Sequence, residues 1–393
     1  MKNCFVLVLS ICLSTAALAQ GVDPLHNVSG TAGSAGVELP WVRAGSDGWT
    51  YFHALDAHVT YVSESGPTTQ RNEVFSTNWL AAGVERNFGE RGFVLLRGRV
   101  SLEPYTLPKD DGYPQMLQYV SPESGGPLTD RMRAHDLIGE AAVQVGWRPT
   151  QSTLLHVYAA AVGDPALGAA PYALRASGVD FAEAPYAYDI QESFHDSTSV
   201  ITAGFATRFL TIEGSVFHDA VTFGEHTEID TGDIDSNAIR VTFTPGSNLA
   251  IQASRGELGD DAAKRKITTA SLSYGGQLAS LTALWTRREN VTRETETAYG
   301  FELALRGARS TLMGRAEWVD RPLGFPDLPA VPTPAVEQTT HYALGYLFDF
   351  VHGPRYRAGA GVNIDYHTQS HDLPARYGHK PQAIYAFVRF RSN

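Results

Sequence analysis

Cysteine and long apolar runs are almost absent from this sequence. Its 393 residues include two cysteines, Cys4 and Cys12, and both lie within the first nineteen residues. Because disulfides need paired cysteines, the rest of the chain has no disulfide framework. Beyond that beginning the sequence has no run of eighteen apolar residues, which excludes a membrane-spanning helix there. Helix signatures are scarce, whereas glycine, tyrosine and phenylalanine are plentiful.

Basic residues are outnumbered by acidic ones. The chain has 31 Lys plus Arg against 42 Asp plus Glu, and its formal net charge is −11. A domain that binds nucleic acid usually gathers a positive excess on one surface. The charge balance therefore predicts no nucleic-acid partner.

The first nineteen residues have the pattern of a secretory signal peptide. Lys2 supplies the positive start, "CFVLVLSICL" the apolar core, and Ala17-Leu18-Ala19 the small-residue cleavage site. We expect residues 1–19 to be removed and the exported chain to begin near Gln20. Residues 20–48 are polar and rich in glycine, and we interpret them as a periplasmic N-terminal lead-in.

The stretch "YRAGAGVNIDYH" at 356–367 shows a pattern that recurs along the chain. Every second residue from Tyr356 to Tyr366 is apolar, and the residues between are polar or small. A period of two indicates a β-strand. The two tyrosines are about 33 Å apart along a strand. At a tilt of roughly 40° they span about the 25 Å apolar band of an outer-membrane barrel. The pattern predicts an apolar face towards lipid and a polar face, with Asp365 and His367, towards a watery lumen.

Sixteen candidate strands follow one another from Trp49 onward. Short turns with glycine or proline alternate with long loops, and 105–131 and 163–196 are the longest of these. Outer-membrane barrels have short turns on the periplasmic side and long loops outside. An even number of strands then places both termini in the periplasm. The predicted strands are 50–63, 72–86, 92–104, 132–147, 152–162, 197–207, 209–218, 234–243, 247–256, 266–275, 277–287, 294–306, 309–319, 338–350, 354–366 and 382–391.

These features predict an all-β fold for residues 49–393, a closed antiparallel transmembrane β-barrel of about sixteen strands. Closure is required because lipid offers no hydrogen-bond partner to an open strand edge. A soluble β-sandwich or solenoid is the alternative. It would place charged groups outside, and it would not pair short turns with long loops so regularly.

Nearly all of the exported chain resembles porin-type outer-membrane barrels. The last predicted strand, "AIYAFVRFRSN", resembles the signal read by the barrel-assembly machinery, although Arg391-Ser392-Asn393 follow the final aromatic residue. Short stretches such as "SLEPYT" at 101–106 and "GDPALG" at 163–168 are similar to a family of uncharacterised predicted outer-membrane proteins. The resemblance implies a place in the bacterial outer membrane, contact with its lipid and passive transport. General porins are often trimers, so it also implies a possible homotrimer.

In the sixteen-stranded porins that the chain resembles, the third outer loop commonly folds into the lumen and narrows it. Here that loop is 163–196, and it is acidic. An acidic loop facing a basic wall would set a transverse field that screens solutes by charge. The alternative is a loop that merely covers the mouth, with the wall arginines paired to lumen carboxylates. The loop acids are Asp164, Asp180, Glu183, Asp189, Glu192 and Asp196, and the predicted pore-lining residues are Arg97, Arg99, Arg315, Arg357, Arg389, Glu302, Glu317 and Asp365.

Thirteen histidines raise the question of a metal, because imidazoles with a carboxylate suit zinc or copper. The weak candidates are His135, His195, His367 and His371. Their spacing matches no metal-binding signature, so we predict no metal site and no cofactor. We also predict no enzyme. The chain has no nucleophile elbow, and adjacent serine and histidine residues on one strand point apart.

The sequence as a whole predicts a porin-like channel. Small polar solutes or ions would pass through the lumen and be filtered by the loop and the arginines. The alternative is a barrel without an open pore that acts as a binding or metal-handling surface protein. The two hypotheses differ in whether a continuous water path runs through the lumen.

Overall fold

The computed structural model describes residues 30–33, 35, 41–45, 48–65, 72–108, 136–192, 197–220, 226–259, 264–290, 295–322, 336–369 and 381–392. The predicted signal peptide lies outside these residues, as does most of the loop 105–131. Among the candidates named above, Asp196, His135, His195 and His371 also lie outside them.

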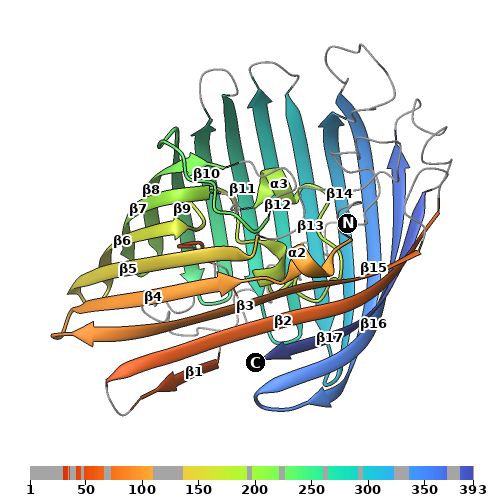
Figure 1. The fold of residues 1–393 in the computed structure, drawn as a ribbon, viewed down its shortest axis with the longest axis horizontal. Helices are drawn as coiled ribbons and strands as arrows, with labels where there is room; N and C mark the ends of the chain where they lie inside the picture. Colours follow the sequence, from red (N-terminus) through yellow and green to blue (C-terminus); the bar gives the residue numbers. More distant parts are fainter. Residues whose placement is uncertain are drawn as a thin grey trace, which may run out of the picture.

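Sixteen antiparallel strands close into a barrel (Figure 1). Each strand pairs with the next along the chain, and the last strand, β17, pairs with β2 to close the ring. All sixteen predicted strands are confirmed, with shifts at their ends. The barrel strands are β2 (Trp49–Glu64), β3 (Asn72–Phe88), β4 (Gly92–Val100), β5 (Ile138–Thr150), β6 (Thr153–Val162), β7 (Ser197–Thr207), β8 (Leu210–Asp219), β9 (Ser236–Gly246), β10 (Leu249–Leu258), β11 (Arg265–Gly275), β12 (Ala279–Asn290), β13 (Glu296–Arg306), β14 (Ser310–Pro322), β15 (Val336–His352), β16 (Tyr356–Gln369) and β17 (Gln382–Ser392).

The largest difference from the predicted bounds lies around the loop between β4 and β5. The strand predicted at 92–104 ends at Val100, and the short helix α2 (Glu103–Thr106) follows it. Pro104 occupies the first turn of this helix. A proline has no N–H to donate to a strand ladder but is well tolerated at a helix start. The strand predicted from residue 132 begins at Ile138.

A short strand that the sequence pattern did not predict lies inside the segment 20–48. This strand, β1 (Trp41–Ala44), pairs with the first residues of β2, from Thr50 to His53. The C-terminal strand β17 pairs with β2 only from Asp56 to Glu64. β1 therefore pairs with the N-terminal part of β2, which β17 does not reach.

The two faces of each strand differ as the alternation predicts. On β15, Tyr342, Leu344, Tyr346 and Phe348 are exposed on the outside of the chain, whereas Ala343 and Leu347 between them are buried. On β16, Ile364 is 54% exposed and its neighbours Asn363 and Asp365 are 0% exposed. An apolar outer face with a polar inner face is the pattern of a barrel that stands in lipid. The soluble sandwich and solenoid are excluded by the closed ring.

No helix among the described residues is long and apolar enough to cross a membrane.

Candidate functional site

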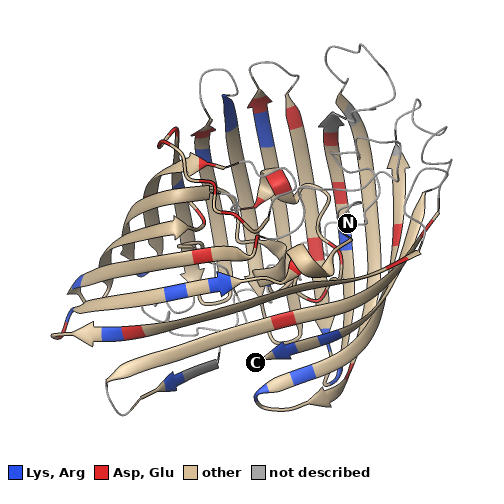
Figure 2. Cartoon of the chain, in the orientation of Figure 1, with Lys and Arg blue, Asp and Glu red and all other residues tan. Residues whose placement is uncertain are grey.

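The long connection between β6 and β7 lies inside the barrel. Its described part, residues 163–192, forms the short elements η2 (Tyr172–Leu174) and α3 (Tyr188–Gln191) and passes through the interior of the ring (Figure 1). Nearly all of its residues are buried, including the carboxylates of Asp164, Asp180 and Glu183. Figure 2 shows acidic residues in red on this segment and both acidic and basic residues, in red and blue, on the strands around it. We call residues 163–192 the inward loop.

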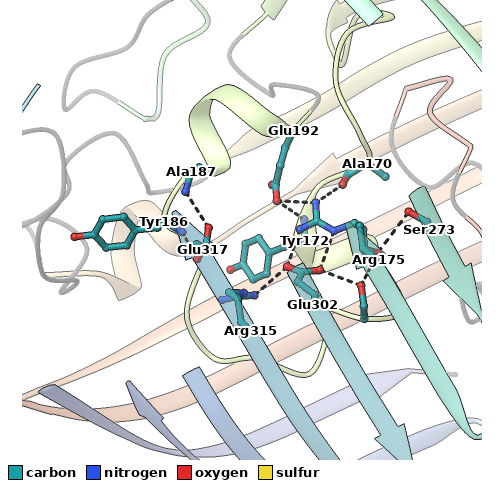
Figure 3. Close-up of polar contacts among 12 residues, drawn as sticks. Ala170, Tyr172, Arg175, Tyr186, Ala187, Glu192, Ser273, Glu302, Arg315 and Glu317 are labelled. Carbon is teal, nitrogen blue, oxygen red and sulfur yellow. Dashed lines mark hydrogen bonds and ion pairs between the residues drawn. The ribbon is translucent and has the colours of Figure 1, made fainter. Parts of the chain in front are cut away.

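Arg175 fastens the middle of the inward loop to the barrel wall. Its guanidinium donates to Glu302 on β13 at 2.8 and 3.1 Å and to Glu192 at 2.8 Å (Figure 3). A further bond of 2.8 Å goes to the carbonyl oxygen of Ala170. Burial acts to lower the pKa of Arg175, but the charges of Glu302 and Glu192 outweigh it and raise that pKa. Arg175 therefore stays charged and holds two parts of the loop against one strand.

Asp180, five residues after Arg175 in the inward loop, contacts a cluster of arginines. It forms ion pairs with Arg389 and with Arg391, the latter at 2.9 Å, both on β17. Arg306 on β13 lies 3.4 Å away. Burial alone would raise the pKa of Asp180, but Arg391, Arg389 and Arg306 lower it well below its ordinary value. The carboxylate is therefore ionised across the physiological pH range.

Glu183 lies between β14 and β16. Its Oε1 is 3.5 Å from Nη1 of Arg315, and its other carboxylate oxygen accepts a hydrogen bond from Asn363. Arg315 also lies 3.4 Å from Glu302. Burial, together with the charge of Asp365, raises the pKa of Glu183 to about 8. Arg315 therefore stands between Glu302 and Glu183, and the carboxyl group of Glu183 is largely protonated at neutral pH.

Backbone groups of the inward loop also bind the wall. Glu317 on β14 accepts hydrogen bonds from the N–H groups of Tyr186, at 2.8 Å, and Ala187, at 3.2 Å (Figure 3). Its Oε2 also lies 2.9 Å from Nδ1 of His341 on β15. Glu317 thus ties the loop to a histidine of the next strand.

The two ends of the inward loop are held by further ion pairs. At its start, Asp164 lies 3.3 Å from Arg99 on β4. Near its end, Asp189 lies 3.1 Å from Arg288 on β12, which also pairs with Glu296. Burial raises the pKa of Asp164 to about 6 despite the charge of Arg99. Contacts therefore run from β4 at one end of the loop to β12–β17 along the rest.

Residues Gly30 and Thr31 also contact the inner wall, which the sequence analysis did not foresee. The N–H of Gly30 donates to Glu140 at 3.2 Å, and its carbonyl oxygen accepts from Arg97. Thr31 accepts a bond of 2.9 Å from Arg240 on β9, which is paired with Glu213. The polar, glycine-rich pattern of 20–48 predicts a lead-in and gives no sign of these contacts.

The structure gathers most of the sequence-predicted site residues that it describes. Arg315, Arg389, Glu302 and Glu317 contact the inward loop directly, and Asp365 lies beside its Glu183. Arg99 pairs with Asp164, whereas Arg97 pairs with Glu140 of the wall.

Arg357 is half-buried near the turn at 353–355 and belongs to none of the loop contacts described above. The arginine–carboxylate pairs join loop to wall in some places, as between Asp180 and Arg389, and wall to wall in others, as between Arg97 and Glu140.

Several inward residues were missed by the sequence analysis. Arg391 follows Arg389 at the strand period of two, so extending the alternation to the end of β17 would have included it. The same alternation places His341 inward, opposite the predicted pore-lining residue Glu317 in the register of β14 and β15. Arg240, Arg288 and Arg306 carry no signal beyond their strand positions.

Comparison with known proteins shows a structural likeness only. No family model matches the chain, and no curated protein matches it. OmpF of Salmonella typhi, solved in complex with daunomycin, aligns with a TM-score of 0.55 and 9% identity over 89% of this chain and 100% of that chain.

Two other solved structures give similar values. An anion-selective porin from Comamonas acidovorans has a TM-score of 0.53 at 11% identity, over 87% of this chain and 99% of that one. OmpT, an outer membrane protein of Vibrio cholerae, has a TM-score of 0.51 at 10% identity, over 88% of this chain and 98% of that one. At these identities the likeness establishes the fold, which is that of porin-type outer-membrane barrels.

Proposed function

We propose that this protein is a porin-like channel of the bacterial outer membrane that passes small polar solutes or ions by diffusion. The observation that carries the proposal is the inward loop, which lies inside a closed sixteen-stranded barrel and is fastened to several strands. A barrel of this size encloses a lumen, and a segment folded into it narrows the path. The solved porin with anion selectivity shares this fold, which supports the same class of function here.

The filter proposed here combines size with local charge. Arg389 and Arg391 face Asp180, and Arg315 faces Glu183 and Glu302. Because Arg389 and Arg391 are paired with Asp180, and Arg315 with Glu302, much of their long-range field cancels, and the width left by the loop becomes the main selector. Unequal pairing around the lumen leaves a residual field that orients polar solutes.

Single-channel recording tests this proposal. The exported chain is refolded, inserted into a planar bilayer and recorded with a salt gradient. Discrete conductance steps with a defined reversal potential are expected. A barrel that is folded and heat-modifiable but electrically silent would overturn the channel.

The second candidate is a barrel with a filled lumen that serves as a binding surface protein. It is favoured by the apolar packing around the inward loop. Phe181 packs with Met313, Leu347 and Phe387, and a second cluster joins Tyr186 and Ile190 to wall residues including Phe75 and Tyr385. Contacts of this kind are typical of a packed core and favour a loop that blocks the path.

Excision of the loop distinguishes the two candidates. In the variant, residues 166–190 are replaced by a short glycine–serine linker. A channel narrowed by the loop conducts in the wild type and conducts more in the variant. A plugged barrel is silent in the wild type and conducts only after excision.

We further propose that the chain stands in outer-membrane lipid with both termini in the periplasm, is inserted by the barrel-assembly machinery and assembles as a homotrimer. The exposed apolar outer face of strands such as β15 supports the lipid contact. Chemical cross-linking in outer-membrane fractions tests the trimer, for which a ladder ending at three subunits is expected. Protease protection of tags at the two ends tests the topology.

A further inference from the structure

Two histidines are stacked against each other across β15 and β16 inside the barrel. His341 and His367 are direct partners in the strand register. Their ring centroids lie 4.8 Å apart and the rings are inclined by only 11°. Both side chains are fully buried. Opposed residues of an antiparallel pair share one face of the sheet, so both imidazoles are presented to the same part of the lumen.

A carboxylate completes a compact set of three ligating groups. Nε2 of His341 lies 3.0 Å from Oδ2 of Asp365. One ligating atom from each of His341, Asp365 and His367 lies within 4.8 Å of the others. A tetrahedral zinc ion with bonds of about 2.0–2.2 Å holds its ligand atoms about 3.4 Å apart. Small side-chain rotations would therefore bring the three atoms to ligating distances.

Polar atoms at this point lack hydrogen-bond partners among the described residues. They are both ring nitrogens of His367, Oδ1 of Asp365 and both carboxylate oxygens of Glu64. Glu64 on β2 and Asp365 on β16 both pair with Ala383, from its two sides, so the two carboxylates flank one position of β17. Buried polar groups without partners are costly. A bound cation would give a partner to one ring nitrogen of His367 and to carboxylate oxygens of Asp365 and Glu64.

Glu317 orients one of the two histidines. Its Oε2 lies 2.9 Å from Nδ1 of His341, which leaves Nε2 facing Asp365. The inward loop holds Glu317 in turn through the N–H groups of Tyr186 and Ala187. In metal centres a ligating histidine commonly donates its second N–H to a carboxylate, which fixes the tautomer and the ring. The orienting bond needed for a ligand is therefore already present.

We propose that His341, Asp365 and His367 form a lumen site for a divalent transition-metal ion of the zinc class, with Glu64, across β17 from Asp365, as the fourth ligand. Two imidazoles with carboxylate oxygens suit zinc and its close neighbours better than magnesium or calcium, which prefer oxygen ligands alone. The site differs from the loop histidines weighed from the sequence and shares only His367 with them. It goes beyond the proposed channel and does not depend on conduction.

Calorimetric titration of the refolded, chelator-treated barrel with zinc tests the site. We expect one ion per chain, and we expect His367→Gln or Asp365→Asn to weaken binding at least tenfold. The matched control is His156→Gln, a buried histidine on β6 beside Glu213, which should bind zinc as the wild type does. Absence of saturable binding to the wild type would overturn the proposal. So would binding that both site variants retain, because the ion would then belong to histidines of the loops.

X-ray absorption of the zinc-loaded wild-type barrel provides a test that needs no variant to fold. Two imidazole ligands and the remainder oxygen are expected at the ion. A spectrum without two imidazoles would overturn the assignment of His341 and His367. Heat-modifiable migration of each variant on gels confirms that loss of zinc reflects a changed site and not an unfolded chain.

Discussion

Arg175 and Glu302 form a two-pronged ion pair between the inward loop and β13. Nη2 lies 2.8 Å from Oε1 and Nε lies 3.1 Å from Oε2, although the residues are 127 positions apart in sequence. Both side chains are almost completely buried. A guanidinium and a carboxylate matched in this way are held in one geometry and screened little by salt. The pair is therefore a rigid anchor of the inward loop on β13.

Removing Arg175 should loosen the loop and destabilise the barrel. Arg175→Met leaves Glu302 and Glu192 buried with fewer partners, and breaking such a pair costs about 3 kcal/mol or more. Urea unfolding in lipid vesicles measures the loss of unfolding free energy. The matched control is Lys266→Met at the exposed pair with Glu257, whose side chains are 42% and 35% exposed, where about 1 kcal/mol or less is expected. Equal effects in the two variants would contradict the anchoring role.

Asp180 should control the charge of the lumen beside β17. Asp180→Asn leaves Arg389 and Arg391 with less compensation, so the local potential becomes more positive. In a conducting barrel the permeability ratio of cations to anions should fall, on the order of twofold. Reversal potentials in a salt gradient measure it. The control Glu289→Gln removes a carboxylate that is 44% exposed and should leave the permeability ratio unchanged. An equal fall in the ratio for Glu289→Gln would contradict a specific effect of Asp180.

Asp164 should make the stability of the barrel depend on pH. Burial raises the pKa of its carboxyl group to about 6 in the folded chain, from an ordinary value of 3.8. The folded state therefore favours the protonated carboxyl group. The stabilisation that the protonated Asp164 gives the folded state is complete below about pH 4 and is lost as pH rises through about 6. The charged neighbours are Arg99, Arg97 and Glu140.

Comparison with Asp164→Asn isolates this contribution. From pH 4 to pH 8 the wild type should lose up to about 3 kcal/mol of unfolding free energy relative to the variant. Urea unfolding at several pH values measures it. A difference that stays constant over this range would show that Asp164 does not titrate in this window.

A charged residue on the outer face of β15 should destabilise the barrel. Leu344 is 60% exposed on the outside of the strand and pairs with Ile364 of β16. Leu344→Arg would place a cation in lipid and should cost about 2–4 kcal/mol if the position lies near the bilayer centre. Leu278→Arg, in the turn between β11 and β12 at 76% exposure, should cost about 1 kcal/mol or less. Refolding yields and urea midpoints in vesicles compare the two, and equal costs would contradict the membrane placement of β15.

The sequence predicted the strands well because the signal for each strand is local. Along "YRAGAGVNIDYH" the alternation of faces follows from the strand period, and β16 has the faces it predicts. Residues 20–48 were harder to interpret. β1 has only four residues, too few to show a period, and Gly30 and Thr31 carry no pattern that predicts contact with Arg97 or Arg240.

The charged residues were found more easily than their partners. Arg389 and Asp180 were both named from the sequence, one as a wall residue and one as a loop residue. Nothing in either segment indicates that they form an ion pair, because the pairing depends on how the inward loop crosses the lumen. The same holds for Glu317, whose bonds go to backbone groups of Tyr186 and Ala187.

The sequence by itself determined the number of strands, their two faces and the alternation of short and long connections, because each depends on residues close together in the chain. Only the tertiary structure decided which polar groups meet inside. Glu64 and Asp365 flank the same residue of β17 although they belong to opposite ends of the chain. Ring closure and strand register create that neighbourhood, and neither leaves a trace in the local pattern.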